Sequence, residues 1–170
     1  MRVVRRTARM VSGVGLGAVS ALHAVWAAGS HWPARDRKTL AEAVIGNDTG
    51  FPSRAATATV ALGASVAGVI AAGGLGSGPN MVRVRRVIGV ALLTRAAVGG
   101  DVALAALGRP HGQPRFISLD NRFYRPLCAL LGLATLIGAR ASAAAPSAPG
   151  DSPLCAARGR RVRASVECSR

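Results

Sequence analysis

The chain has 170 residues, half of them hydrophobic, with a mean hydropathy of +0.32 and a formal net charge of +15. Apolar positions run continuously over long stretches, and a chain this short cannot bury several such helices in protein alone, which argues against a soluble domain. The basic residues are almost all arginine, and no aromatic residues are interleaved with them to stack on bases. The composition therefore also argues against nucleic-acid binding.

Four apolar stretches predict an all-α polytopic membrane protein, a bundle of four transmembrane helices. Each stretch approaches the roughly 20 residues that a helix needs to cross the hydrocarbon core. A basic cytoplasmic N-terminus is expected over residues 1–9, the transmembrane domain over 10–141 and a disordered basic tail over 142–170. The predicted spans are residues 10–28, 55–76, 87–107 and 127–145.

The first apolar stretch also fits a secretory signal, because Arg5 and Arg6 precede it and small residues stand at Ala27 and Ala28. Cleavage there would leave a secreted soluble protein. Three further apolar stretches argue against that alternative, so we expect the first span to be kept.

Glycines in this stretch satisfy the dinucleotide-binding pattern GxGxxA from Gly13 to Ala18, with Asp36 beyond it. A dinucleotide site needs a strand before the glycines, and the arginine-rich segment before Gly13 cannot be a buried strand. The glycines fit close helix packing better, and oligomers through small-residue faces are expected. The small-residue stripes are Gly13, Gly17 and Ala21, then Gly63, Ala67 and Ala71, then Ala64, Gly68 and Ala72, and finally Ala96 and Gly100.

Arginine counts favour both termini in the cytoplasm of a multi-pass cell-membrane protein, although the opposite loops are basic too. The turn from Ser77 to Asn80 predicts that the second and third spans are antiparallel neighbours. The arginines behind this orientation are Arg2, Arg5, Arg6 and Arg9 in the N-terminal flank, Arg83, Arg85 and Arg86 in the second connection, and Arg140 with the tail arginines.

Three ionisable residues fall inside predicted spans, His23, Arg95 and Asp101. Such residues are costly in lipid and usually face the bundle interior. His23 and Asp101 lie at matching depth, which permits a hydrogen bond between them. Arg95 lies deeper and on another face, so we expect it to bond to carbonyls, to hydroxyls such as that of Thr57, Thr59 or Ser65, or to water. Three interpretations stay open: these groups fix helix register, they form a ligand, ion or proton site, or a predicted span boundary is misplaced.

All six aromatic residues and all three histidines fall on the predicted outer side. They form either an interfacial belt or a cap in which the first and third loops fold together over an extracytoplasmic pocket. The candidate pocket residues are His23, Trp26, Trp32, Arg95, Asp101, Phe116, Asp120 and Tyr124.

No cofactor, metal or catalytic residue is predicted. The histidines lack ligand spacing, and Cys128, Cys155 and Cys168 lack the pairing of a disulfide framework or a metal knuckle. Cys128 is expected to be a packing residue.

Two runs resemble signatures of a family of small bacterial membrane proteins, domain of unknown function 3995. The run from His23 to Pro33 is similar to its first signature, and the run from Phe116 to Cys128 to its second. Arg95, followed by Gly99, Gly100 and Asp101, is similar to a pattern in its third span. The resemblance covers roughly Gly13–Ala139 and implies four spans and a membrane location, but no activity.

The sequence therefore predicts a binding, accessory or small permeation component with an outward-facing aromatic and polar cap. Its expected partner is the lipid bilayer, and no nucleic acid is expected. The alternative is a membrane-embedded enzyme or redox module using His23 and Asp101, although no enzyme class is assigned.

Overall fold

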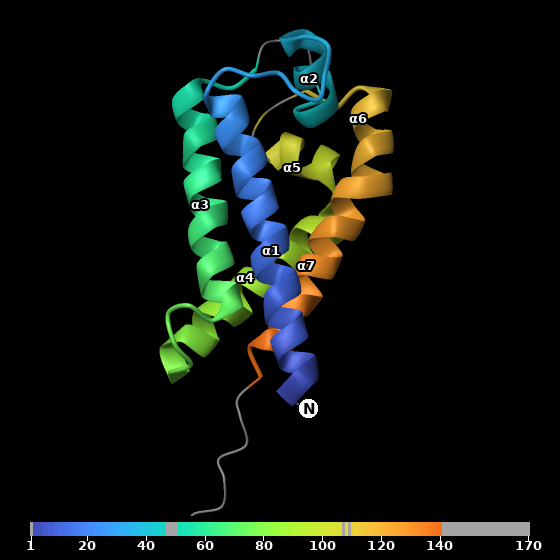
Figure 1. Ribbon diagram of the computed structural model, residues 1–170. Helices are drawn as coiled ribbons and strands as arrows, with labels where there is room; N and C mark the ends of the chain where they lie inside the picture. Colours follow the sequence, from blue (N-terminus) through green and yellow to red (C-terminus); the bar gives the residue numbers. More distant parts are fainter. Residues whose placement is uncertain (1, 47–50, 107, 109, 141–170) are drawn as a thin grey trace, which may run out of the picture.

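The computed structural model describes residues 2–46, 51–106, 108 and 110–140, and within these ranges the chain is helical and has no strand (Figure 1). The predicted all-α class is therefore confirmed. The predicted tail, residues 142–170, lies outside the described residues. The elements are α1 (Arg2–Ala27), α2 (Arg37–Val44), α3 (Arg54–Ala72), α4 (Pro79–Val98), α5 (Gly100–Ala106), α6 (Pro114–Leu119), the π-helix η1 (Asp120–Tyr124) and α7 (Arg125–Gly138).

Two of these helices, α1 and α3, are long and apolar enough to cross a membrane. A third crossing is added if α4 and α5, which meet at a bend of 101°, are taken together. The structure thus supports two or three candidate spans, where the sequence predicted four.

Several predicted boundaries are wrong, for local reasons. Helix α1 begins at Arg2 rather than near Met10, because no glycine or proline interrupts the segment between them. Helix α3 stops at Ala72 rather than continuing to Gly76, because Gly73 takes a left-handed conformation (φ +98°) that ends the helix. Helix α4 begins at Pro79, eight residues before the predicted span, because proline suits a first helical turn.

The two remaining errors concern helices with polar residues. The last helical run begins at Pro114 and ends at Gly138, whereas residues 127–145 were predicted. Its first half carries Arg115, Asp120 and Arg122, so it does not appear in a hydropathy pattern. The third predicted span, 87–107, is broken at Gly99.

The helices form two close pairs, α1 with α3 and α4 with α7, and α1 also packs on α7. Figure 1 shows the N-terminus, the connection between α3 and α4, and the end of α7 at one end of the bundle. Helices α2, α5 and α6 lie at the other end. Successive long helical segments therefore run in alternating directions.

Small residues permit the close helix crossings. Gly13 of α1 faces Ala72 of α3, and Gly89 of α4 faces Gly132 of α7. The predicted stripes are partly used, because Gly17 and Gly63 have open space around them. Oligomerisation through these faces stays a prediction.

Arginines from other parts of the chain bond to the carbonyl ends of three helices. Arg9 Nε donates to the Gly138 carbonyl of α7 (3.0 Å), and Arg85 Nε donates to the Ile70 carbonyl of α3 (2.6 Å). Arg125 Nε donates to the Ala96 carbonyl of α4 (2.7 Å). The last carbonyls of a helix lack partners within it and carry partial negative charge, so each guanidinium stabilises the helix end that it reaches.

The short helix α2 is fixed at its start by Asp36, whose Oδ1 accepts a hydrogen bond from the Thr39 backbone N–H (2.7 Å). This bond lowers the pKa of the exposed Asp36 carboxyl. The stabilisation that this bond gives α2 is present above the ordinary pKa of aspartate and is lost as the pH falls through the lowered value.

The crossing of α4 and α7 gives a test of the packing. A Cβ added to Gly132 would lie 2.9 Å from the Gly89 carbonyl oxygen, which belongs to the backbone and cannot move alone. We expect Gly132→Ala to destabilise the bundle by about 1–3 kcal/mol, measured by denaturant or thermal unfolding in detergent. Gly63→Ala is the matched control, because Gly63 has no neighbour within 4 Å. An equal loss in both variants would contradict the packing.

Candidate functional site

The most unusual feature of the structure is the break between α4 and α5. Helix α4 ends at Val98, Gly99 takes a positive φ of +83°, and α5 departs at 101° to α4. A residue with a side chain is strained at such a φ, so glycine suits this position. Because of the bend, α5 runs away from the axis of α4.

A second irregularity lies opposite the break. Residues 114–138 form one helical run, and within it η1 widens to a π-turn from Asp120 to Tyr124. Single π-turns inside α-helices are rare and occur often at functional sites. Here the π-turn begins with Asp120 and is followed by Arg125, and both side chains reach the break.

The Asp120 carboxylate bridges the two sides of the break. Its Oδ1 accepts a hydrogen bond from Arg95 Nη2 on α4 (2.6 Å), and its Oδ2 accepts one from the Gly100 backbone N–H on α5 (2.6 Å). Only 5% of the Asp120 side chain is exposed. These are charge-assisted bonds in a sheltered place, which makes them strong.

Arg125 holds the carbonyl side of the same break. Its Nε and Nη2 donate to the carbonyls of Ala96 (2.7 Å) and Ala97 (3.0 Å), and its Nη1 donates to Asn121 Oδ1 (2.9 Å). The carbonyls in the last turn of α4 thus bond to a cation, Arg125, and the first N–H of α5 bonds to an anion, Asp120. Both groups come from one helical run.

The cap predicted from the first and third loops has a structural basis. The Gln113 backbone N–H donates to the Gly46 carbonyl (2.8 Å), and the Tyr124 hydroxyl donates to the Ala43 carbonyl (3.2 Å). Buried Phe116 lies against Gly100, where an added Cβ would come within 2.5 Å of its ring. The segments of the first and third loops therefore contact each other, and a cap over a pocket stays a prediction.

Arg95 keeps one nitrogen unused. Its Nη1 is enclosed and has no hydrogen-bond partner among the described residues, while 32% of the whole side chain is exposed. An unpaired guanidinium nitrogen in a sheltered position is costly. This is the donor at the break that a further group could use.

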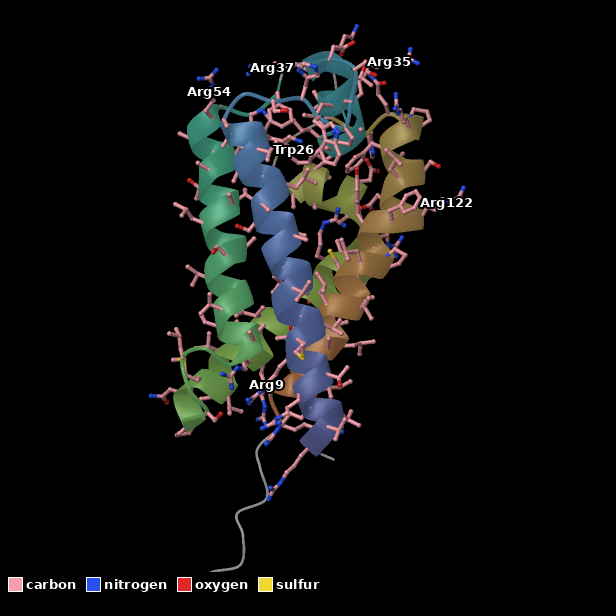
Figure 2. All side chains as sticks on the ribbon, in the orientation of Figure 1. Arg9, Trp26, Arg35, Arg37, Arg54 and Arg122 are labelled. Carbon is pink, nitrogen blue, oxygen red and sulfur yellow. The ribbon has the colours of Figure 1, made fainter. Side chains whose placement is uncertain are left out.

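The aromatic residues of the first loop form a second group. Trp26 packs on His23 (ring centroids 4.9 Å apart) and on Phe51 (6.0 Å), and its Nε1 donates to the Trp32 carbonyl (2.7 Å). Figure 2 shows Trp26 near the end of the bundle where Arg35, Arg37 and Arg54 also lie. Beside His23 and Trp26 is a mostly apolar hollow of about 180 Å³.

The predicted hydrogen bond between His23 and Asp101 is wrong. His23 Nδ1 bonds to the Val19 carbonyl of its own helix (2.8 Å). Asp101 pairs instead with His111 Nδ1 (2.8 Å) and the Gly112 N–H (2.9 Å). The prediction assumed a straight third helix, whereas the break carries Asp101 away on α5.

The expected partners of Arg95 also need correction. A hydroxyl of Thr57, Thr59 or Ser65, a carbonyl or water was predicted, whereas Arg95 pairs with the carboxylate of Asp120. Thr57 donates to the carbonyl of Ser53, the residue that caps α3, and Thr59 donates to the carbonyl of Ala55 within α3. The residues predicted as one pocket therefore separate into a charged group of Arg95, Asp120, Phe116 and Tyr124, an aromatic group of His23, Trp26 and Trp32, and Asp101 with His111.

The roles of three positions at the break were not predicted from the sequence. Arg125 was taken as an ordinary loop arginine, Gly99 was noted only for the resemblance, and Gly100 was noted for the resemblance and as a small packing residue. The adjacent glycines inside an apolar run were the available signal for a break. Among the described residues, no three histidine, cysteine, aspartate or glutamate side chains converge as metal ligands do.

Comparison with known families gives one match. Residues 16–135 match the family described as "Protein of unknown function (DUF3995)", and the chain therefore belongs to that family. No curated protein and no solved structure matches. The matched residues include the whole break, from Arg95 to Arg125.

The bridge across the break gives a direct test. Asp120→Asn removes the charge opposite Arg95, and we expect it to destabilise the protein by about 2–3 kcal/mol, less than for a fully enclosed pair because Arg95 is partly exposed. Unfolding in detergent, followed by circular dichroism, measures the change.

The double variant Arg95→Gln/Asp120→Asn should lose less than the sum of the two single losses, because the pair is coupled. Glu42→Gln is the control for removing one carboxylate at the same end. Additive losses at Arg95 and Asp120 would show that the two residues do not act as a pair.

Proposed function

We propose that this DUF3995 protein crosses the membrane four times and binds a small anion at the break between α4 and α5. The sequence predicted a binding, accessory or small permeation component, and this proposal selects the binding component. Permeation is the wider class of function to which such binding belongs. The observation that carries the proposal is the Arg95–Asp120 pair at a broken helix, with one Arg95 nitrogen left without a partner.

Helix lengths support four crossings. At about 1.5 Å per residue, the 20 residues of α4 rise roughly 30 Å, which matches the hydrocarbon core. The continuous run 114–138 is longer still and includes the apolar helix α7. Helices α1 and α3 are the other two of the four proposed crossings.

Charge supports an orientation with both termini in the cytoplasm. The end of the bundle that carries the N-terminus, the α3–α4 connection and the end of α7 is rich in arginine (Figure 1). The break then lies near the outer boundary, beneath the contact of α2 with α6. Ligand would reach it from outside the cell.

Broken helices support a binding role by analogy. In membrane proteins, irregular backbone is tolerated where it is buried in protein or lines a water-filled cavity, and discontinuous helices often form the substrate site. The break here is short, and charged side chains satisfy it on both sides. Such a site presents donors at fixed positions to an incoming group.

The charges favour an anion as the ligand. The Asp120 carboxylate already pairs with the Arg95 guanidinium and accepts a hydrogen bond from the Gly100 N–H, so it offers little to a cation. The unused Arg95 Nη1 is a donor only, and guanidinium groups match carboxylates and phosphates. A small carboxylate is the simplest ligand that would complete this arrangement.

The alternative of an enzyme using His23 and Asp101 loses its geometric basis. The two residues have separate partners, and 86% of the His111 side chain that pairs with Asp101 is exposed. An exposed pair of this kind contributes little stability. Binding is therefore the function that we favour.

The four crossings can be tested by cysteine labelling. In a variant without native cysteines, we introduce His31→Cys, Asn80→Cys or His111→Cys. A membrane-impermeant thiol reagent applied to intact cells should label positions 31 and 111, and position 80 only after the cells are permeabilised. Labelling of all three in intact cells, or of 80 alone, would contradict the proposed topology.

Ligand binding can be tested by thermal stability in detergent with acetate, benzoate or inorganic phosphate as the probe. We expect a carboxylate to raise the unfolding temperature of the natural protein and to have no such effect on Arg95→Gln. Glu42→Gln should respond like the natural protein. If none of the probes stabilises it, or if Arg95→Gln responds equally, anion binding at the break is wrong.

A further inference from the structure

We infer that the arginine-rich end of the bundle, opposite the break, is a binding surface for the phosphate groups of anionic lipids. The inference rests on the membrane location in the proposed function and not on the ligand at the break. It assigns a separate surface and a separate partner.

The described part of this end has arginines and no acidic side chain. The four described carboxylates, of Asp36, Glu42, Asp101 and Asp120, all belong to α2, α5, η1 or the segment before α2, at the other end (Figure 1). The arginines of the surface are Arg2, Arg5, Arg6, Arg9, Arg83, Arg85, Arg86 and Arg140. Positive charge at this end is therefore not balanced within the described chain.

Two of these arginines point inward, and their partners among the described residues are carbonyls. Arg85 is fully buried, donates to the carbonyls of Ile70 and Gly76, and leaves its Nη1 without a hydrogen-bond partner in the described part of the chain. Arg9 lies at the same end (Figure 2) and donates to the Gly138 carbonyl. A carbonyl supplies only a partial charge, so these guanidinium groups keep most of their positive field.

Other arginines bring charge to the surface. Arg2, Arg6, Arg83, Arg86 and Arg140 are exposed. Arg83 and Arg86 belong to the first turns of α4, and Gly78 provides no side chain to cap that helix start. The amino end of α4 thus adds positive potential beside them.

An anionic headgroup fits this surface better than a nucleic acid does. Guanidinium groups bind phosphate in a bidentate manner, and their stems can lie along acyl chains while the heads reach the interface. Single-stranded nucleic acid would require stacking aromatics, and the described aromatic residues lie on the elements at the other end. The cytoplasmic leaflet offers anionic phosphate in the place where this surface lies.

The experiment uses the full chain in mild detergent and follows its unfolding temperature as phosphatidylglycerol, phosphatidylcholine or inorganic phosphate is added. Phosphatidylglycerol should stabilise the natural protein most. The double variant Arg83→Gln/Arg86→Gln should lower the apparent affinity for phosphatidylglycerol about 25-fold, at about fivefold for each arginine. These exposed residues make none of the helix-end bonds described above, so the variant should fold.

The matched control is Arg35→Gln/Lys38→Gln, which removes the same charge from exposed positions at the other end. It should leave the phosphatidylglycerol affinity unchanged. Equal stabilisation by phosphatidylcholine, or an equal loss in the control, would overturn the inference. Equal stabilisation by inorganic phosphate that Arg83→Gln/Arg86→Gln abolishes would assign the surface to a free anion and overturn the lipid. Because only the part lost in this double variant counts, phosphate bound to Arg95 does not affect the result.

Discussion

A helix that stops within a bundle leaves backbone carbonyls on one side of the break and N–H groups on the other, and the fold depends on satisfying both. At the break after α4, Arg125 bonds to the carbonyls of Ala96 and Ala97, while Asp120 accepts from the Gly100 N–H. In lipid no water replaces a missing partner, so such bonds are obligatory rather than optional. The same rule explains Arg9 and Arg85, which bond to carbonyls at or near the ends of α7 and α3. Arginine is suited to this role because its donors diverge and its charge is permanent.

The hydrogen bonds of each arginine distinguish those that only hold the structure from those that keep a donor available for recognition. Arg125 has all three of its nitrogens bonded, whereas Arg95 and Arg85 each keep one buried nitrogen without a partner among the described residues. Asp120 is the only carboxylate at the break that meets a guanidinium, and it also bonds to the backbone. The protein therefore holds the end near the break with a mixed pair of charges and the opposite end with arginines and carbonyls. The two ends are chemically different although both are basic.

Hydropathy was sufficient to predict the helical class, the first two apolar helices and the side of the molecule where the aromatics gather. It could not locate α6 and η1, because Arg115, Asp120 and Arg122 interrupt the apolar pattern there. It also could not reveal that Asp101 leaves the line of α4, because depth along a span was counted for a straight helix. The pair of Arg95 with Asp120 joins residues 25 positions apart, and no local periodicity encodes such a contact. Family resemblance marked both segments, Arg95–Asp101 and Phe116–Cys128, but not the bond between them.

The π-turn η1 has a mechanical consequence. Asp120 and Arg125 stand at its two ends, and each holds a different side of the break. A single extra residue in the winding of this segment sets the direction of both side chains. Rewinding it to ordinary α geometry would change the direction of these two side chains relative to each other, so the bonds that hold α4 and α5 at the break depend on one and the same π-turn.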